Sequence, residues 1–218
     1  MALRKTKNIY RLDPNMIVRP REGRSAWKWY TKHVRSHAYL RWPFLALGGN
    51  WDKIVTIPEI AREDEMIELF VKGIPPTKTE TYLHMVEELN RTGLVRFPRI
   101  KTLEQIDRYF ERLHRLYDDI KINGYKTYKE LGTSSENEIQ IRITRKGELV
   151  KAGEGTHRLA IAKVLGLKEV PVVIDLVHAS LWRKWKKERP NRSIDPLDYG
   201  IQTLKARVEV TPTTEIHP

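Results

Sequence analysis

Apolar and polar residues follow a helical period between Thr102 and Gly124. Thr102 and Gln105 have the spacing of an N-terminal capping box, and Gly124 stands where a left-handed cap ends a helix. The pattern therefore predicts a long amphipathic helix between these two ends. Its apolar stripe, spaced by three and four residues, consists of Leu103, Ile106, Phe110, Leu113, Tyr117 and Ile120.

Two further helices are expected before this one. The run TYLHMVEELN (81–90) follows Thr77 and Glu80, which have the same capping-box spacing. A weaker helical pattern covers PEIAREDEMIELFVKG (58–73). The segment 42–115 is therefore expected to be mainly helical.

The pattern changes to that of strands from residue 138 onward. The run EIQIRIT (138–144) alternates apolar and polar side chains, as a half-buried strand does. The run VPVVIDLV (170–177) is continuously apolar and rich in β-branched residues, which indicates a fully buried strand. Between them we expect a turn at 145–148, a short strand at 149–152, and a helix over 157–165 that ends at Gly166. The fold class predicted is mixed α/β (α+β), a small mixed sheet with packed helices.

Composition fits an ordinary globular chain, and its positive charge is unevenly placed. The 218 residues carry a formal net charge of +12. Residues 1–41 hold 11 Lys or Arg against 2 Asp or Glu, and 182–192 hold 6 against 1, whereas 42–181 are neutral. Basic flanks of this kind attract nucleic acid, phosphates or an anionic membrane surface, or else serve only as a solvated surface.

The chain has no cysteine, so disulfides, thiolate nucleophiles and zinc–thiolate sites are excluded. No apolar run approaches the roughly 20 residues that span a bilayer, and the first residues lack the apolar core of a signal peptide. A cytoplasmic protein without a transmembrane segment is the expectation.

The sequence GEGTHR (153–158) directly precedes the expected helix over 157–165. Gly153 and Gly155 allow a tight turn and the close approach of a ligand to the backbone. The N–H groups at the start of the helix, with the positive end of its dipole, make such a turn an anion site, most often for phosphate. The alternative is an ordinary tight connection between a strand and a helix.

The side chains of this turn suit phosphate chemistry. Arg158 could bind phosphate oxygens with two N–H groups, and Thr156 could cap the helix or donate its hydroxyl. His157 could donate to phosphate or act as a general acid or base. Glu154 could hold a divalent cation that bridges phosphates, or act as a base.

Other candidate groups lie elsewhere in the chain. His33 and His37 are spaced by four residues, as two metal ligands on one helix face would be, but no third ligand lies nearby in sequence. Four aromatic residues among basic ones could stack on bases, sit at a membrane interface or pin the N-terminal segment onto the body: Trp27, Trp29, Tyr30 and Trp42. Trp182 and Trp185 are expected to anchor the end of the core. Carboxylates that could complete a phosphoryl-transfer site are Asp52, Asp118, Asp119 and Glu138.

Two stretches, LYDDIKINGYKTY (116–128) and EIQIRITRKGELVKAGEGTHRLAIAKVLGLKEVPVVI (138–174), resemble the ParB/sulfiredoxin superfamily. The run IYRLDPNMIVRP (9–20) is similar to the first motif of that family. The resemblance is clear over about 116–176 and weaker over 8–20. It implies the superfamily fold with a long helical insertion between the two parts.

The resemblance also implies a nucleotide site at Gly153–Arg158. Partition ParB proteins bind CTP with magnesium through the matching turn and load onto DNA. Related enzymes bind a nucleotide there and phosphorylate a small molecule such as free serine. Sulfiredoxins bind ATP there but need a catalytic cysteine, which this chain lacks.

The chain departs from the partition proteins at this turn. That group has Gly-Glu-Arg-Arg, whereas this sequence has Gly153-Glu154-Gly155-Thr156 followed by His157-Arg158. The Gly-x-His-Arg form is closer to the kinase-like and sulfiredoxin-like branches. The residues after the core contain Pro190, Pro196 and Pro212, and no DNA-reading helix-turn-helix is expected in them.

The sequence predicts a single domain over 1–218, with a core formed by 8–20 and 116–176, a helical insertion at 42–115 and a basic C-terminal extension at 177–218. The function hypothesis is a nucleotide-binding, ParB-like phosphotransferase or nucleotide hydrolase that uses Mg²⁺ with ATP, ADP or CTP and acts on a small hydroxylated acceptor. Gly153, Gly155, Thr156, His157 and Arg158 would bind phosphates, Glu154 the metal, and Glu154 and His157 would be catalytic. The alternative is a ParB-like nucleic-acid-binding or nuclease-type protein that uses the basic flanks.

Overall fold

The computed structural model of the chain describes residues 8–20, 45–53, 56–57, 60, 62–133 and 138–210. Of residues 45 and 207–210 it describes the backbone only. The expectations for Trp27, Trp29, Tyr30, His33, His37 and Trp42 fall outside these residues.

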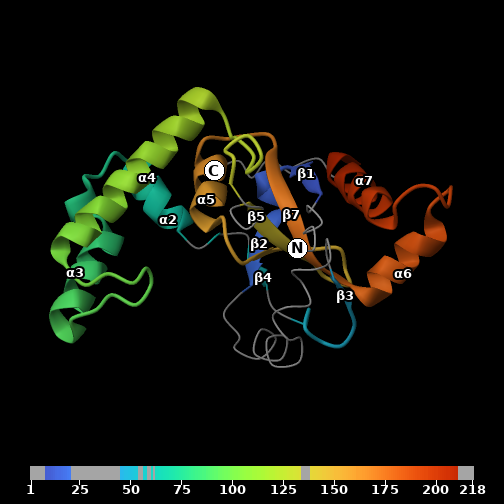
Figure 1. Cartoon of the computed structure of the whole chain (residues 1–218), viewed down its shortest axis with the longest axis horizontal. Helices are drawn as coiled ribbons and strands as arrows, with labels where there is room; N and C mark the ends of the chain where they lie inside the picture. Colours follow the sequence, from blue (N-terminus) through green and yellow to red (C-terminus); the bar gives the residue numbers. More distant parts are fainter. Residues whose placement is uncertain are drawn as a thin grey trace, which may run out of the picture.

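A mixed sheet of seven strands lies at the centre of the described part of the molecule (Figure 1). Its strand order is β1-β7-β5-β6-β2-β4, and β3 also pairs with β7. The β5–β7, β2–β6 and β3–β7 pairs are parallel, while β1–β7, β5–β6 and β2–β4 are antiparallel. The strands are β1 (Ile9–Leu12), β2 (Ile17–Pro20), β3 (Leu45–Leu47), β4 (Thr56–Ile57), β5 (Ile139–Ile143), β6 (Leu149–Ala152) and β7 (Val170–His178).

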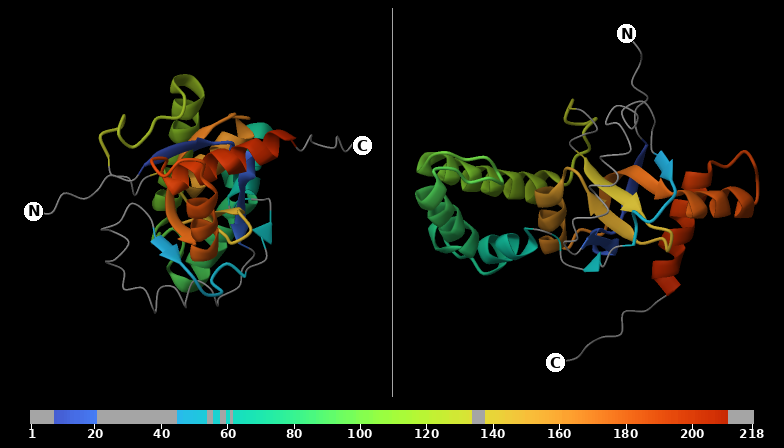
Figure 2. Two further views of the ribbon diagram at one scale, coloured as in Figure 1. Left: turned by 90° about the vertical axis from the view of Figure 1, so that its right-hand side faces the viewer. Right: turned by 90° about the horizontal axis from the view of Figure 1, so that it is seen from below.

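The helices form two groups at opposite ends of the sheet (Figures 1 and 2). One group contains α2, α3 and α4, and the other contains α6 and α7, with α5 between the first group and the sheet. The helical elements are η1 (Pro14–Met16), α2 (Glu63–Met66), the π-helical turn η2 (Ile67–Val71), η3 (Pro76–Lys78), α3 (Glu80–Thr92), α4 (Leu103–Asn123), α5 (Thr156–Val164), α6 (Ala179–Glu188) and α7 (Pro196–Val210).

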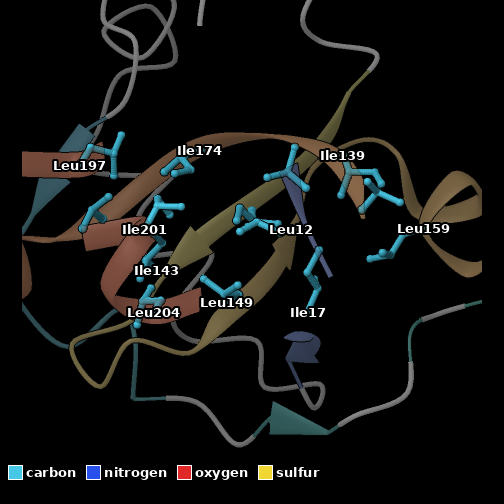
Figure 3. Close-up of a cluster of buried hydrophobic side chains, with 14 of the residues drawn as sticks. Leu12, Ile17, Ile139, Ile143, Leu149, Leu159, Ile174, Leu197, Ile201 and Leu204 are labelled. Atoms are coloured by element: carbon cyan, nitrogen blue, oxygen red, sulfur yellow. The ribbon is translucent and has the colours of Figure 1, made fainter. Parts of the chain in front are cut away.

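The larger apolar core lies on the sheet between α5 and α7 (Figure 3). Ile139, Ile141 and Ile143 alternate along β5 and are all fully buried, as the period of a strand requires. Leu159 of α5 lies on one side of this cluster, and Leu204 of α7 lies on the other. Burial of apolar area of this kind is the main stabilising contribution to the fold.

A second apolar core joins α5 to the helical group. Ala160 and Ile161 pack with Phe110 and Leu113 of α4, whereas Leu159 faces the sheet cluster. The four residues Leu159, Ala160, Ile161 and Ala162 are all fully buried. Because α5 has a core on two sides, its N-terminal end is held rigidly between the sheet and the helical group.

The predicted fold class, mixed α/β, is confirmed. The Thr102 cap is also confirmed, since its side chain accepts a hydrogen bond from the N–H of Gln105. The cap predicted at Thr77 is wrong, because Pro75 and Pro76 lead into the turn η3 and Thr79 caps α3 instead. The Thr79 hydroxyl accepts from the N–H of Tyr82.

The ends of two predicted segments belong to the central body. The segment 42–115 contains α2, α3 and most of α4, but it begins with β3 and β4, which pair with the sheet. The extension 177–218 contains α6 and α7, and both helices pack onto the core. Trp185 is buried there and Trp182 is partly buried, as expected for aromatic anchors.

Candidate functional site

The turn between β6 and α5 is built on two glycines with left-handed backbone. Gly153 has φ +48° and Gly155 has φ +86°. Gly155 is the N-cap of α5, so Thr156 is the first helical residue and does not cap the helix. Without a side-chain cap, the first N–H groups of α5 have no partner from the cap residue.

Close packing also requires glycine at position 155, whereas at position 153 a Cβ would meet the movable end of the Gln140 side chain. A Cβ at Gly155 would lie 2.7 Å from the Cα of Ile139, and a Cβ at Gly153 would lie 2.2 Å from Oε1 of Gln140. The first contact is with backbone and cannot be relieved by a side-chain rotation. The fold therefore accounts for the glycines even without a ligand.

Lys151 lies directly beneath the turn. Its buried ammonium group donates to the carbonyl oxygens of Ala152 at 2.6 Å, Gly153 at 3.0 Å and Glu154 at 2.5 Å. All three carbonyls consequently point toward one nitrogen.

This arrangement fixes the direction of the N–H groups in the turn. In a trans peptide the C=O of one residue and the N–H of the next point in opposite directions. The N–H groups of Gly153, Glu154 and Gly155 are thus directed away from Lys151, and they have no acceptor among the described residues. These outward N–H groups lie next to the positive end of the α5 helix dipole, a position that favours an anion.

Burial lowers the pKa of Lys151 to about 7. The nearby Glu154 opposes this effect, and the positive charge of Arg142 adds to it. An anion bound above the turn would favour the charged form of Lys151, because opposite charges raise the pKa of a lysine.

His157 turns its imidazole toward the helical group. Its Nε2 lies 2.9 Å from the hydroxyl oxygen of Tyr109 on α4. The Tyr109 hydroxyl is also 3.2 and 3.1 Å from the two carboxylate oxygens of Glu65. Burial, with a smaller effect of the positive charge of Arg62, lowers the pKa of His157 to about 4, so the imidazole is neutral at pH 7.

The protons in this chain can be assigned when Glu65 is ionised. Burial raises the pKa of Tyr109, which keeps the phenol protonated and able to donate to Glu65. The Nε2–H of His157 then donates to the phenol oxygen, which leaves Nδ1 as the unprotonated nitrogen. Nδ1 has no hydrogen-bond partner in the part of the chain that the structure describes.

Glu65 is itself buried, and burial raises its pKa to about 7. The guanidinium of Arg62, 3.9 Å away, and the Tyr109 hydroxyl both act in the opposite direction. Glu65 and Tyr109, both buried, and the half-buried His157 therefore form a polar chain that ends at the glycine turn.

Arg158 turns to the other side of α5. One nitrogen donates to the carbonyl oxygen of Lys126 at 2.5 Å, and the guanidinium carbon lies 4.2 Å from the centre of the Tyr125 ring. Another nitrogen lies 3.8 Å from the carboxylate of Glu138. In this arrangement Arg158 holds the segment after α4 against the start of α5.

Glu138 is fully buried next to the turn. One carboxylate oxygen accepts from the N–H of Tyr128, while the other, Oε2, has no hydrogen bond. Burial raises the pKa of Glu138, and the contacts with Tyr128 and Arg158 partly oppose this.

The two remaining predicted site residues, Glu154 and Thr156, lie nearer the protein surface. Glu154 is exposed and Thr156 is half-buried at the start of α5. No group of three His, Asp or Glu side chains that could hold a metal occurs within the described ranges. A metal at Glu154 would thus need phosphate oxygens or water as its other ligands.

Of the other carboxylates predicted from the sequence, only Glu138 comes near the turn. Asp118 and Asp119 are exposed near the end of α4. Asp52 is buried and binds Arg145, which donates to it through its backbone N–H at 2.7 Å and through its side chain. Although burial opposes it, this pairing lowers the pKa of Asp52, whose role is to lock the loop after β3 to the β5–β6 turn.

Sequence reasoning missed three groups of this site. They are Lys151, Tyr109 and Glu65. Lys151 had a signal in the sequence, since it lies in a short strand directly before the glycines. Tyr109 and Glu65 had none, because only the packing of α2 and α4 against α5 brings them to His157.

Comparisons with protein families, curated proteins and solved structures found no match to this chain. Within the described residues, no helix is long and apolar enough to cross a membrane.

Proposed function

We propose that the chain binds the polyphosphate of a nucleotide at the Gly153–Arg158 turn, with Mg²⁺, and transfers or cleaves a phosphoryl group there. The observation that carries this proposal is the set of three N–H groups, of Gly153, Glu154 and Gly155, turned outward by Lys151. The resemblance to the ParB/sulfiredoxin superfamily is part of the same proposal, since it points to this turn. ATP, ADP and CTP are the candidate nucleotides.

The residues of the turn have separate roles in the proposal. Backbone N–H groups and the Thr156 hydroxyl bind phosphate oxygens. The exposed carboxylate of Glu154 contacts a Mg²⁺ ion that the phosphates hold. His157 accepts the proton of a small hydroxylated acceptor, or of water, at Nδ1. Arg158 positions the segment that closes over the start of α5.

Calorimetry with ATP, ADP and CTP, each with and without Mg²⁺, tests the binding step. We expect saturable binding of at least one nucleotide, tighter with Mg²⁺. Glu154→Ala removes the carboxylate proposed to contact the metal, and Glu111→Ala is its control on the exposed face of α4. Loss of the Mg²⁺ effect in Glu154→Ala alone supports the assignment, whereas no binding of any nucleotide rejects the proposal.

A second candidate function, binding of nucleic acid, has one structural observation in its favour. Helix α6 exposes four basic side chains, and Lys184 makes only a 3.9 Å contact with Glu188. The exposed basic residues are Arg183, Lys184, Lys186 and Lys187. Such a row could bind backbone phosphates without reading bases.

A gel-shift series against salt concentration separates this candidate from the first. Replacing the four basic residues of α6 by Gln should lower the affinity for DNA or RNA and reduce its dependence on salt. Binding that is absent in the unaltered protein, or unchanged by the four replacements, rejects a role for α6.

A further inference from the structure

A pocket of about 420 Å³ lies in the helical group, beside α3. A volume of this size suits a small molecule. One wall is a face of α3, which presents Glu80, His84 and Glu88 at intervals of four residues. Arg62 and Arg96, which lie outside α3, also line the pocket.

The lining residues offer two kinds of polar chemistry. Arginine side chains supply N–H donors in the planar arrangement that suits a carboxylate or a phosphate. Glutamate side chains supply acceptors for hydroxyl groups. Glu88 and Arg96 form no ion pair with any described residue.

An exposed aromatic residue also lines the pocket. The side chain of Phe97 is 84% exposed. The carbonyl oxygen of Phe97 accepts from Arg62 at 3.0 Å, which holds these two lining residues together. A ring of this kind offers a flat apolar surface to the carbon skeleton of a ligand.

Arg62 connects the pocket to the glycine turn. It is a non-glycine residue with φ +76°, a strained conformation that is concentrated at functional positions. Arg62 lines the pocket, and its guanidinium lies 3.9 Å from Glu65, which is bound to Tyr109 and through it to His157. An anion bound to Arg62 would partly cancel the positive charge of its guanidinium and so weaken the electrostatic field that this charge exerts on Glu65 and His157.

We propose that this pocket binds a small hydroxylated organic anion. We also propose that Arg62 transmits binding there to His157 as a change in the electrostatic field on the imidazole. The anionic group lies on Arg62 and Arg96, the hydroxyl groups face the glutamates of α3, and the carbon skeleton lies against Phe97. Two side chains separate Arg62 from His157, so the occupant is an effector and not the acceptor of the phosphoryl group. Binding in this pocket is independent of the proposed function, because it concerns a different cavity, and only the occupant's role as an effector rests on that function.

Amide and imidazole NMR shifts of the full chain test the proposal with three probes. Glucuronate carries a carboxylate, glucose 6-phosphate carries a phosphate, and glucose carries neither. We expect one of the two anions to cause saturable shifts at residues 62, 84, 88 and 96, and glucose to cause none. The preferred anion distinguishes a carboxylate ligand from a phosphate ligand.

Two arginine variants provide the matched comparison. Arg96→Gln should weaken binding at least tenfold, while Arg99→Gln, an exposed arginine of the same segment that does not line the pocket, should leave it unchanged. Binding should also move the imidazole ¹⁵N signals of His157. Absence of saturable shifts with both anions, or equal binding to Arg96→Gln, overturns the site. Saturable pocket shifts without any change at His157 overturn the connection.

Discussion

The ammonium group of Lys151 donates to the carbonyl oxygen of Glu154 at 2.5 Å, from the strand directly below the turn that Glu154 occupies. The same nitrogen binds the two preceding carbonyls. A lysine in this position organises the turn from inside, and the outward N–H groups follow from peptide geometry. The proposed phosphate site thus depends more on the backbone than on the side chains of His157 and Arg158.

Lys151→Met should disrupt the turn. Methionine fills similar space but has no donor, so three inward carbonyls lose their partner, at a cost of about 1–3 kcal/mol in the free energy of unfolding. We expect nucleotide affinity to fall at least tenfold by calorimetry. Lys146→Met, at an exposed site on the β5–β6 turn, is the control and should change neither quantity. Wild-type affinity in Lys151→Met contradicts this role for the lysine.

Gly155→Ala should destabilise the chain more than Gly166→Ala. Both glycines have left-handed backbone, with φ +86° and +65°, so both substitutions carry conformational strain. Only at Gly155 would the new Cβ meet backbone, at 2.7 Å from the Cα of Ile139. Urea denaturation should show an additional loss of about 1–3 kcal/mol for Gly155→Ala. Equal losses would show that the close approach to β5 is absent.

Tyr109→Phe should leave two groups without their common partner. The hydroxyl bridges Glu65 and His157, and its removal should lower the free energy of unfolding by about 1–3 kcal/mol. Tyr117→Phe is the matched control on the same helix, because that hydroxyl has no hydrogen bond to a described residue. A Tyr109 variant no less stable than the Tyr117 variant would contradict the polar chain.

The pH dependence of stability should report Glu65 separately from His157. The folded pKa of Glu65, about 7, is above its ordinary value of 4.5, so its stabilising contribution is full below pH 4.5 and is lost as the pH rises through 7. The pKa of His157, about 4, is below its ordinary 6.5, so its contribution is lost as the pH falls from 6.5 to 4. The two effects oppose each other between pH 4.5 and 6.5.

Glu65→Gln should remove one of these opposing effects. Without the loss caused by Glu65, the change in unfolding free energy from pH 5 to pH 7 should be more positive in the variant than in the wild type, by about 1–3 kcal/mol. Asp64→Asn changes an exposed neighbour and should leave the wild-type dependence intact. Urea denaturation at the two pH values measures the difference. The same dependence in Glu65→Gln and wild type would rule out a raised pKa for Glu65.

Periodicity predicted the long helix α4 and the strand β5, whereas β3, β4, α6 and α7 were not predicted. The alternation of β5 and the apolar stripe of α4 from Ile106 onward were reliable because a helix or strand with one buried face must repeat at its own period. Leu103, predicted as part of that stripe, is instead exposed at the start of the helix. The cap of α3 was mispredicted at Thr77, because the prolines before it make a separate 3-10 turn. The pairing of β3 with β7 joins segments about 130 residues apart, and no local pattern encodes such a contact.

The sequence predicted the backbone of the candidate site but not the directions of its side chains. The order of strand, glycines and helix is local, and the structure has it where the sequence placed it. The directions of His157 and Arg158 depend on Tyr109 and Lys126, which lie 48 and 32 residues away in the chain. Whether such side chains face a ligand or the core is decided by tertiary packing.

Backbone amide NMR of the turn tests the central claim most directly. On addition of ATP or CTP with Mg²⁺, the amide signals of Gly153, Glu154 and Gly155 should move together and saturate at one affinity, because phosphate oxygens accept from these three N–H groups. If nucleotide binds while the three signals stay in place, or if no nucleotide moves them at any concentration, the phosphate site is not at this turn.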